Sequence, residues 1–224
     1  MRVVNGALHI LHEYPRVHVK GSCTKRVRPK EKWECPPSGR LKLNLDGAFK
    51  SNGVGGAGVV FRDDKGEVQS CWSKKLMYLQ SPLQAEALAC RMGLAMAVQV
   101  GWTELLVESD SSVLVSALYQ SGNASSEVSR IVEDCKIFMQ QFDYITIRHI
   151  YREANNVAHR LAHFASLDNI VEQNVGEPSC FLVDVLYEDQ CNSSNVNRGR
   201  GFMSPSDRHV GININNGQQT EPPM

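Results

Sequence analysis

The sequence lacks an excess of charge of either sign: its 224 residues carry 24 lysines and arginines against 24 aspartates and glutamates. Without net charge there is no overall positive field of the kind that draws many nucleic-acid-binding proteins to phosphates. The sequence also lacks an apolar run approaching the ~20 residues of a membrane-spanning helix. With 42% hydrophobic residues, we therefore expect one globular, monomeric domain with no membrane association.

Paired cysteines with metal-site or redox spacing are missing as well. The seven cysteines are odd in number and show no Cys-x-x-Cys spacing, and no recognisable signal peptide follows Met1. Reduced thiols fit this pattern best. We therefore expect the protein in the nucleus or cytoplasm and do not expect it to be secreted.

The zero net charge conceals a local bias at the start of the chain. Residues 1–42 contain ten lysines and arginines against three glutamates, which leaves a surplus of seven positive charges. Such runs are usually solvated, so residues 1–38 are predicted to form a basic, poorly ordered extension, with phosphate binding as the alternative. At the other end, the polar composition of residues 191–224 predicts a disordered tail.

Residues 39–168 alternate between strand-like and helix-like patterns, and residues 169–190 offer one more short segment that could dock on this domain. The expected strands are 41–46, 59–61, 67–72, 105–107 and 144–150. The expected helices are 82–100, 113–119, 128–138 and 153–166. Three consecutive strands followed by alternating helices and strands predict an α/β fold with a mixed five-stranded sheet, three strands antiparallel and the later ones parallel, flanked by helices.

Three acidic residues stand where such a sheet would bring them together. Asp46 ends the first strand, Asp110 follows the fourth, and Glu86 lies early in the first long helix. The crossover between the first and fourth strands makes them parallel, so Asp46 and Asp110 can lie side by side. Singly, a turn, a surface ion pair and a helix cap would explain these acids. Together they provide the hard oxygen ligands that Mg²⁺ prefers.

Four motifs in this order resemble type 1 ribonuclease H domains, and most closely their plant reverse-transcriptase-like, retroelement-related branch. The motifs are LNLDGA at 43–48, AEAL at 85–88, ESDS at 108–111 and REANNVAHRLA at 152–162. The resemblance implies the ribonuclease H-like fold and a metal-dependent endonuclease that hydrolyses the RNA strand of RNA–DNA hybrids. It also implies that Asp46, Glu86 and Asp110 are three of four metal-binding acids, which hold two Mg²⁺ ions.

The fourth acid departs from the common pattern of the family. His159 stands where most members have aspartate, and some members of the plant branch likewise have histidine there. Imidazole removes one negative charge and offers one nitrogen instead of two carboxylate oxygens, which weakens binding of a second Mg²⁺. We therefore predict that His159 is a catalytic residue, that activity is reduced, and that Mn²⁺ can substitute for Mg²⁺.

Four further residues are candidates for contact with the substrate: Gly47, Asn52, His149 and Asn155. Asn52 belongs to a turn that resembles the family's loop for the RNA minor groove, where 2′-hydroxyls and phosphates are recognised. His149 ends the fifth strand, where it can handle a proton or contact a phosphate. Two alternatives stay open: a nucleic-acid-binding module that lost cleavage, and a decayed gene fragment with no present function.

Overall fold

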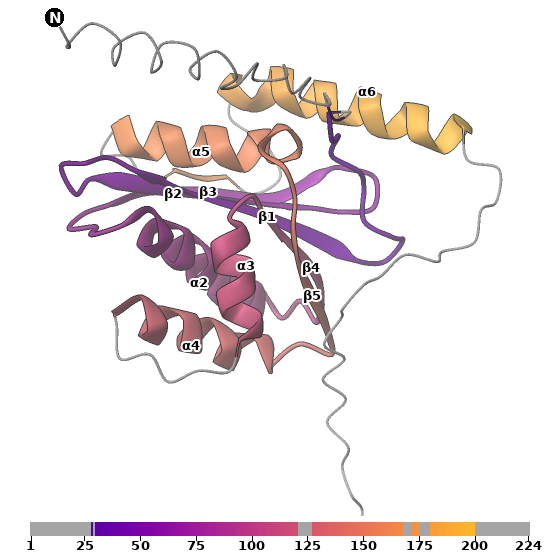
Figure 1. Ribbon diagram of the computed structural model, residues 1–224. Coiled ribbons are helices and arrows are strands. Elements are labelled where there is room, and N and C mark those ends of the chain that lie inside the picture. Colours follow the sequence, from indigo (N-terminus) through magenta and orange to yellow (C-terminus); the bar gives the residue numbers. More distant parts are fainter. Residues whose placement is uncertain (1–27, 29, 121–126, 168–171, 175–179, 200–224) are drawn as a thin grey trace, which may run out of the picture. The chain divides into compact units, whose positions relative to one another are not determined.

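The computed structural model describes residues 28, 30–120, 127–167, 172–174 and 180–199 (Figure 1). By its internal contacts the chain divides into residues 1–30 and residues 31–224, and every helix and strand reported below belongs to the second unit. Most of the basic run at the start of the chain therefore lies outside the described residues. In the described part, no helix is both long enough and apolar enough to cross a membrane.

A six-stranded sheet forms the centre of the domain, with strand order β5-β4-β1-β2-β3-β6. The strands are β1 (Leu41–Phe49), β2 (Gly55–Arg62), β3 (Val68–Leu76), β4 (Glu104–Ser109), β5 (Tyr144–His149) and β6 (Glu172–Asn174). The first three strands pair antiparallel, β4 pairs parallel with both β1 and β5, and β6 pairs antiparallel with β3. The predicted five-stranded mixed sheet is confirmed, and β6 adds a short edge strand that the sequence did not predict.

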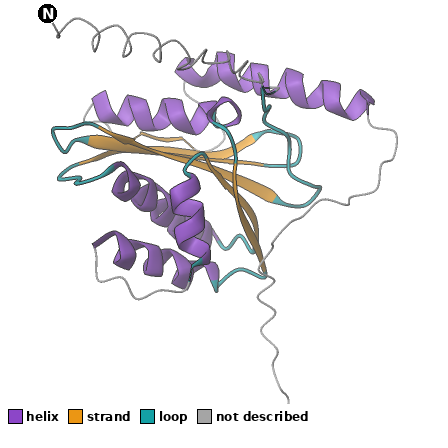
Figure 2. Cartoon of the chain, viewed as in Figure 1, coloured by secondary structure: helices purple, strands orange, loops and turns teal. Residues whose placement is uncertain are grey.

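Helices cover both faces of the sheet (Figures 1 and 2). One face carries α2 (Pro82–Val100), α3 (Ser112–Tyr119) and α4 (Glu127–Met139), and the other carries α5 (Asn156–Leu167) and α6 (Val183–Gly199). The helix predicted from residue 153 begins three residues later, because Arg152–Ala154 form a tight 3-10 turn. This turn connects the end of β5 to α5, and its Arg152 side chain lies next to Asp110.

The start of α2 follows from local chemistry. Ser81 Oγ accepts a hydrogen bond from the N–H of Gln84, and the Gln84 side chain accepts one from the N–H of Gln80. Pro82 takes the first helical position, where its missing N–H costs nothing. The other end closes at Gly101, whose φ of 84° is the left-handed conformation that glycine tolerates best. These caps fix where α2 begins relative to the strands.

The alternating pattern of β1 divides the core between the two faces of the sheet. Leu43 and Leu45 pack with apolar side chains of α2 in the larger core cluster. Val60 and Cys71 pack on the other side with residues of α5 and α6. Since neighbouring residues of a strand point to opposite faces, Asn44 and Asp46 share the face that carries α5.

Two glycines of β2 allow α5 to lie directly on the sheet. A Cβ atom on Gly58 would approach the backbone oxygen of Ala158 to 2.4 Å, and one on Gly56 would come within 2.2 Å of the Ala162 oxygen. Both distances are too short for any side chain, so only glycine permits this packing. The close approach brings the first turn of α5, including His159, towards Asp46.

A buried charge cluster joins β1, β4 and β5 on the same face. Asn44 Nδ2 donates to Glu108 Oε2 at 2.9 Å, and Lys42 Nζ lies 2.8 Å from Glu108 Oε1. Arg148 donates twice to the same carboxylate oxygen. Burial would raise the pKa of Glu108, but the charges of Lys42 and Arg148 outweigh it and hold the pKa below its usual range. Glu108 is therefore an ionised, fully partnered residue of the core.

The same cluster extends to α6 through Arg62, which is only 1% exposed. Arg62 Nη1 donates to Asp189 Oδ2 at 2.7 Å and Nη2 donates to Asn44 Oδ1 at 2.9 Å. Its guanidinium also stacks on the ring of Trp33, 3.5 Å from the ring centroid. The C-terminal helix thus supplies the counter-ion for a buried arginine in the middle of the sheet.

Two of the expected boundaries differ from the structure. The segment expected to be an extension up to residue 38 includes Trp33, which is 1% exposed and donates from Nε1 to Asn44. The polar tail expected from residue 191 begins inside α6, which runs to Gly199. Composition does not indicate these contacts, because they depend on the packing of Trp33 on β1 and of the apolar start of α6, Val185 and Leu186, on the sheet. Residues 200–224 lie outside the described part.

Replacing Asp189 with asparagine is expected to reduce the free energy of unfolding by about 3 kcal/mol, because it leaves the Arg62 charge buried without a counter-ion. The matched control is Asp184→Asn, also on α6, which breaks an exposed pair with Arg160 and should cost less than about 0.5 kcal/mol. Urea denaturation followed by tryptophan fluorescence measures both. Equal losses in the two variants would contradict a special role for the buried pair.

Candidate active site

The three predicted acids converge at one edge of the sheet. Asp46 lies in β1, Asp110 follows β4 directly, and the parallel register pairs Leu45 with Ser109, the residues that precede them. Glu86 reaches the same place from the first turns of α2. One ligand oxygen from each carboxylate lies within 4.8 Å of the others. No other group of three potential metal ligands of this kind occurs among the described residues.

Gly47 determines how closely Glu86 approaches the sheet. A Cβ atom at this position would lie 2.3 Å from the backbone nitrogen of Glu86 and 2.4 Å from the carbonyl carbon of Ala85. The missing side chain therefore lets α2 lie against β1. The N–H of Gly47 also donates to the Glu86 carboxylate. The structure thus shows Gly47 as a support for Glu86, while contact with a substrate stays a prediction.

The electrostatics of the three acids call for a cation. Burial, together with the charges of Asp46 and Asp110, raises the pKa of Glu86 to about 9. Burial and the neighbouring Asp46 likewise raise the pKa of Asp110. Glu86 Oε2 is buried and has no hydrogen-bond partner among the described residues. A divalent cation would satisfy this oxygen and offset the repulsion, so the donor set suits Mg²⁺ or Mn²⁺.

His159 lies beside the acids, as predicted, but it is already engaged. Its Nδ1 is 3.1 Å from Asp46 Oδ2 and 3.0 Å from Arg152 Nη2. A guanidinium only donates hydrogen bonds, whereas a carboxylate only accepts them. One ring nitrogen cannot accept from Arg152 and donate to Asp46 at the same time. His159 Nδ1 can therefore form a hydrogen bond with Arg152 or with Asp46, but not with both at the same time.

Asn155 is 1% exposed and holds the site together from beneath. Its Nδ2 donates to the backbone oxygen of Leu45 at 2.9 Å and to Asp110 Oδ1 at 3.4 Å. The amide thus links β1, next to Asp46, to the acid that follows β4. The structure thus shows Asn155 as a support for Asp110, while contact with a substrate stays a prediction.

The other two predicted substrate residues are exposed and lie outside the lining of the acid cavity. Asn52 is exposed in the turn between β1 and β2, where its Oδ1 accepts from the N–H of Val54. His149 is exposed at the end of β5, and its ring meets Tyr151 edge to face at 5.5 Å between centroids. Neither lines the cavity that contains the acids. Both remain accessible for contact with a long substrate.

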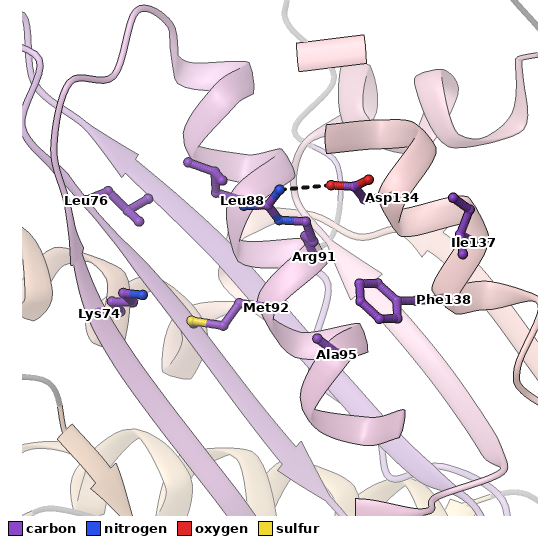
Figure 3. Close-up of a pocket in the computed structure, with 9 residues that line it drawn as sticks. All are labelled: Lys74, Leu76, Leu88, Arg91, Met92, Ala95, Asp134, Ile137 and Phe138. Carbon is purple, nitrogen blue, oxygen red and sulfur yellow. Dashed lines mark hydrogen bonds and ion pairs between the residues drawn. The ribbon is translucent and has the colours of Figure 1, made fainter. Parts of the chain in front are cut away.

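An open cavity of about 570 Å³ gives access to the acids. Its walls come from the first turn of α2, the start of α3 and the side chain of Arg152. A second hollow, of about 550 Å³, lies between β3, α2 and α4 (Figure 3). The charged side chains of that hollow include the exposed ion pair of Arg91 with Asp134 at its rim, and it contains no cluster of acids. The chemistry therefore belongs to the first cavity.

Arg152 is the site residue that sequence reasoning missed. It begins the fourth motif, and the structure places its Nε 3.8 Å from Asp110 Oδ2. In the sequence, a basic residue just before the helix that carries His159 is the pattern that could have indicated this role. The role follows only when Arg152–Ala154 are known to form a 3-10 turn, because that turn places Arg152 and His159 within hydrogen-bonding distance.

Replacing Glu86 with glutamine is expected to stabilise the metal-free protein at pH 8 by up to about 5 kcal/mol, because each pH unit above the unfolded pKa costs about 1.4 kcal/mol. The pKa of Glu86 rises from 4.5 to about 9 on folding. The folded state therefore holds a proton that the unfolded chain releases, and stability is lost as pH rises through this window. Thermal unfolding in EDTA from pH 4 to 9 measures the difference, with Glu133→Gln as the surface control. A difference that is constant with pH would contradict the burial of Glu86.

Comparison with known proteins supports the fold and the site together. A family model described as "Reverse transcriptase-like" matches residues 44–165. A protein of Arabidopsis thaliana named "Putative ribonuclease H protein" is 34% identical over 146 residues, which are 65% of this chain but only 23% of that protein. The chain thus spans about a quarter of that relative's length.

Solved structures show the same fold. Ribonuclease H1 from the halophilic archaeon Halobacterium salinarum superimposes with a TM-score of 0.53 at 25% identity, over 57% of this chain and 97% of that one. LC11-RNase H1 in complex with an RNA/DNA hybrid gives 0.50 at 22% identity, over 57% of this chain and 96% of that one. With its mixed sheet in the ribonuclease H fold and a family model that matches residues 44–165, the chain belongs to the reverse transcriptase-like family.

Proposed function

We propose that the chain is an endonuclease that hydrolyses the RNA strand of RNA–DNA hybrids with the help of divalent metal ions. The observation that carries this proposal is the convergence of Asp46, Glu86 and Asp110 within 4.8 Å in an open cavity. Two comparisons add support. One relative is named as a ribonuclease H protein, and one structure of the same fold was solved with an RNA/DNA hybrid.

The three carboxylates are the residues that would hold Mg²⁺, with Mn²⁺ as a substitute. The family resemblance implies two ions, and histidine in place of a fourth carboxylate weakens binding of the second. Bound ions would supply an activated water and offset charge on the phosphate. The protein's own contribution is to keep the acids in place. Gly47 donates to Glu86, and Asn155 donates to Asp110. His159 lies in hydrogen-bonding distance of Asp46, where it can orient that carboxylate.

Asn52 and His149 are proposed to contact the hybrid outside the acid cavity. Both are exposed, and a hybrid duplex is wide enough to reach beyond a cavity of this size. An amide and an imidazole suit the 2′-hydroxyls and phosphates of an A-form minor groove. The protein would act as a monomer in the nucleus or cytoplasm, where such hybrids arise.

A nucleic-acid-binding module without cleavage is the second candidate. The contact between His159 and Asp46 favours it, because His159 adds no fourth carboxylate and engages one oxygen of Asp46. A weakened metal site would leave the cavity and the fold unchanged. Such a protein would bind hybrids and cut none of them, whichever metal is supplied.

A cleavage assay on an end-labelled RNA–DNA hybrid tests the proposal. The unmodified chain is expected to cut the RNA strand faster in Mn²⁺ than in Mg²⁺, and Asp46→Asn is expected to abolish cutting in both. His159→Asp restores a fourth carboxylate and should raise the Mg²⁺-dependent rate about 10–100-fold. His163→Asp provides the control, since it places the same charge one helical turn away on an exposed position of α5.

The outcomes separate the two candidates. Binding of the hybrid by the unmodified chain and by His159→Asp, with no cut in either metal, would reject the nuclease and support the binding module. An equal increase with His163→Asp would show that added charge, rather than a ligand at residue 159, raises the rate.

A further inference from the structure

Arg152 stands at the mouth of the acid cavity. Of the described residues that line the cavity, it is the one with a positively charged side chain. Its side chain is 62% exposed, whereas the side chains of Asp46 and Asp110 are 3% and 12% exposed. The acids therefore form the floor of the cavity, and the guanidinium lies between them and the solvent. Arg152 is therefore more accessible to an entering ligand than Asp46 and Asp110 are.

The contacts of Arg152 within the described part leave most of its donors available. Nη2 lies 3.0 Å from His159 Nδ1, and Nε lies 3.8 Å from Asp110 Oδ2, which is an ion pair without a hydrogen bond. A guanidinium carries five N–H donors in a planar fork. An exposed pair at this distance contributes little to folding. The arginine is thus held near the acids without being needed to stabilise them.

The chemistry of the open donors specifies the ligand class. The planar fork of arginine matches two oxygens of a phosphate, and such pairs are among the stronger hydrogen bonds in proteins. Carboxylates cannot bind a phosphate by themselves, because both are anions. Metal ions held by Asp46, Glu86 and Asp110 would face the phosphodiester from the side of the acids, and a cation on its outer side can contact the oxygens that face away from them. Arg152 has the charge, the exposure and the geometry for this contact.

Binding of a phosphate by Arg152 would also end the competition between Arg152 and Asp46 for His159 Nδ1. At present its Nδ1 faces both the donor Arg152 and the acceptor Asp46. If the guanidinium turns to a phosphate, Nδ1 is free to donate to Asp46 alone. The hydrogen bond between Arg152 and His159 is then replaced by one between Arg152 and the phosphate, and Asp46 accepts a hydrogen bond from His159.

We propose that Arg152 is a catalytic residue that binds the non-bridging oxygens of the phosphate to be cleaved. Beside His159, where no fourth carboxylate is present, its guanidinium supplies a fixed positive charge that a second metal ion would otherwise provide. This inference rests on the proposed function for the identity of the substrate as an RNA–DNA hybrid. The phosphate contact itself can be tested without cleavage.

The first test measures hybrid binding in EDTA over a range of salt concentrations. Arg152→Ala should weaken binding and reduce the slope of log K against log salt by about one, because one phosphate contact is lost. Arg152→Lys keeps the charge and should restore the slope but not the full affinity. The matched control is Arg40→Ala, just before β1 and at the opposite end of that strand from Asp46, where Arg40 pairs with Glu104. An unchanged slope in Arg152→Ala would overturn the proposal.

The second test counts bound metal ions by Mn²⁺ titration with electron paramagnetic resonance. The unmodified chain is expected to bind one ion, and the double variant Arg152→Ala/His159→Asp two. Two ions in the unmodified chain would reject the view that Arg152 replaces a metal ion.

Cleavage rates test the proposed function and the catalytic role of Arg152 together, and the salt slope tells a failure of one from a failure of the other. If the unmodified chain cuts hybrids, Arg152→Ala should lower the rate about 10²–10³-fold, the scale for loss of one charge-stabilising donor. If it cuts none, the proposed function fails, while the salt slope still decides the phosphate contact. If Arg152→Ala reduces the slope of log K against log salt by about one but leaves the cleavage rate unchanged, Arg152 binds the hybrid and its catalytic role is rejected.

Discussion

The hydrogen bond between Asn44 and Glu108 is the constraint on which the acid site depends. It joins β1 to β4 in the core, two residues before Asp46 on one strand and two residues before Asp110 on the other. Because side chains two residues apart in a strand point the same way, the bonded pair and the acid pair occupy the same face. Lys42 neutralises the buried Glu108, so the strands are cross-linked without an unpaired charge. The acids are aligned by polar contacts deeper in the sheet, and their own repulsion cannot separate them.

Most of the fold could be predicted because it follows from local signals. The alternation around Asp46 and the cap at Ser81 each specify an element from neighbouring residues alone. The edge strand β6 and the limits of the domain could not be predicted this way. Both depend on contacts between segments: β6 pairs with β3, Trp33 donates to Asn44 in β1, and Asp189 pairs with Arg62, 127 residues away.

The site was predictable in its acids and less so in their surroundings. Three carboxylates in a recognisable order imply a metal site from spacing and resemblance together. The roles of Asn155 and Arg152 depend on burial and on the direction of a side chain after a 3-10 turn. Neither the burial of a side chain nor its direction can be predicted from the spacing of residues in the motif. A buried amide and an exposed guanidinium, three residues apart in one motif, thus have opposite relations to the solvent.

The pairing of Arg62 with Asp189 has a consequence for how much of the chain must fold together. The two residues lie in different segments, and the stretch that matches the family ends at residue 165, before α6. Loss of either residue leaves the other charge buried without its counter-ion, so the sheet depends on a helix outside the matched stretch. The unit that must fold together is therefore longer than the stretch that the family model matches.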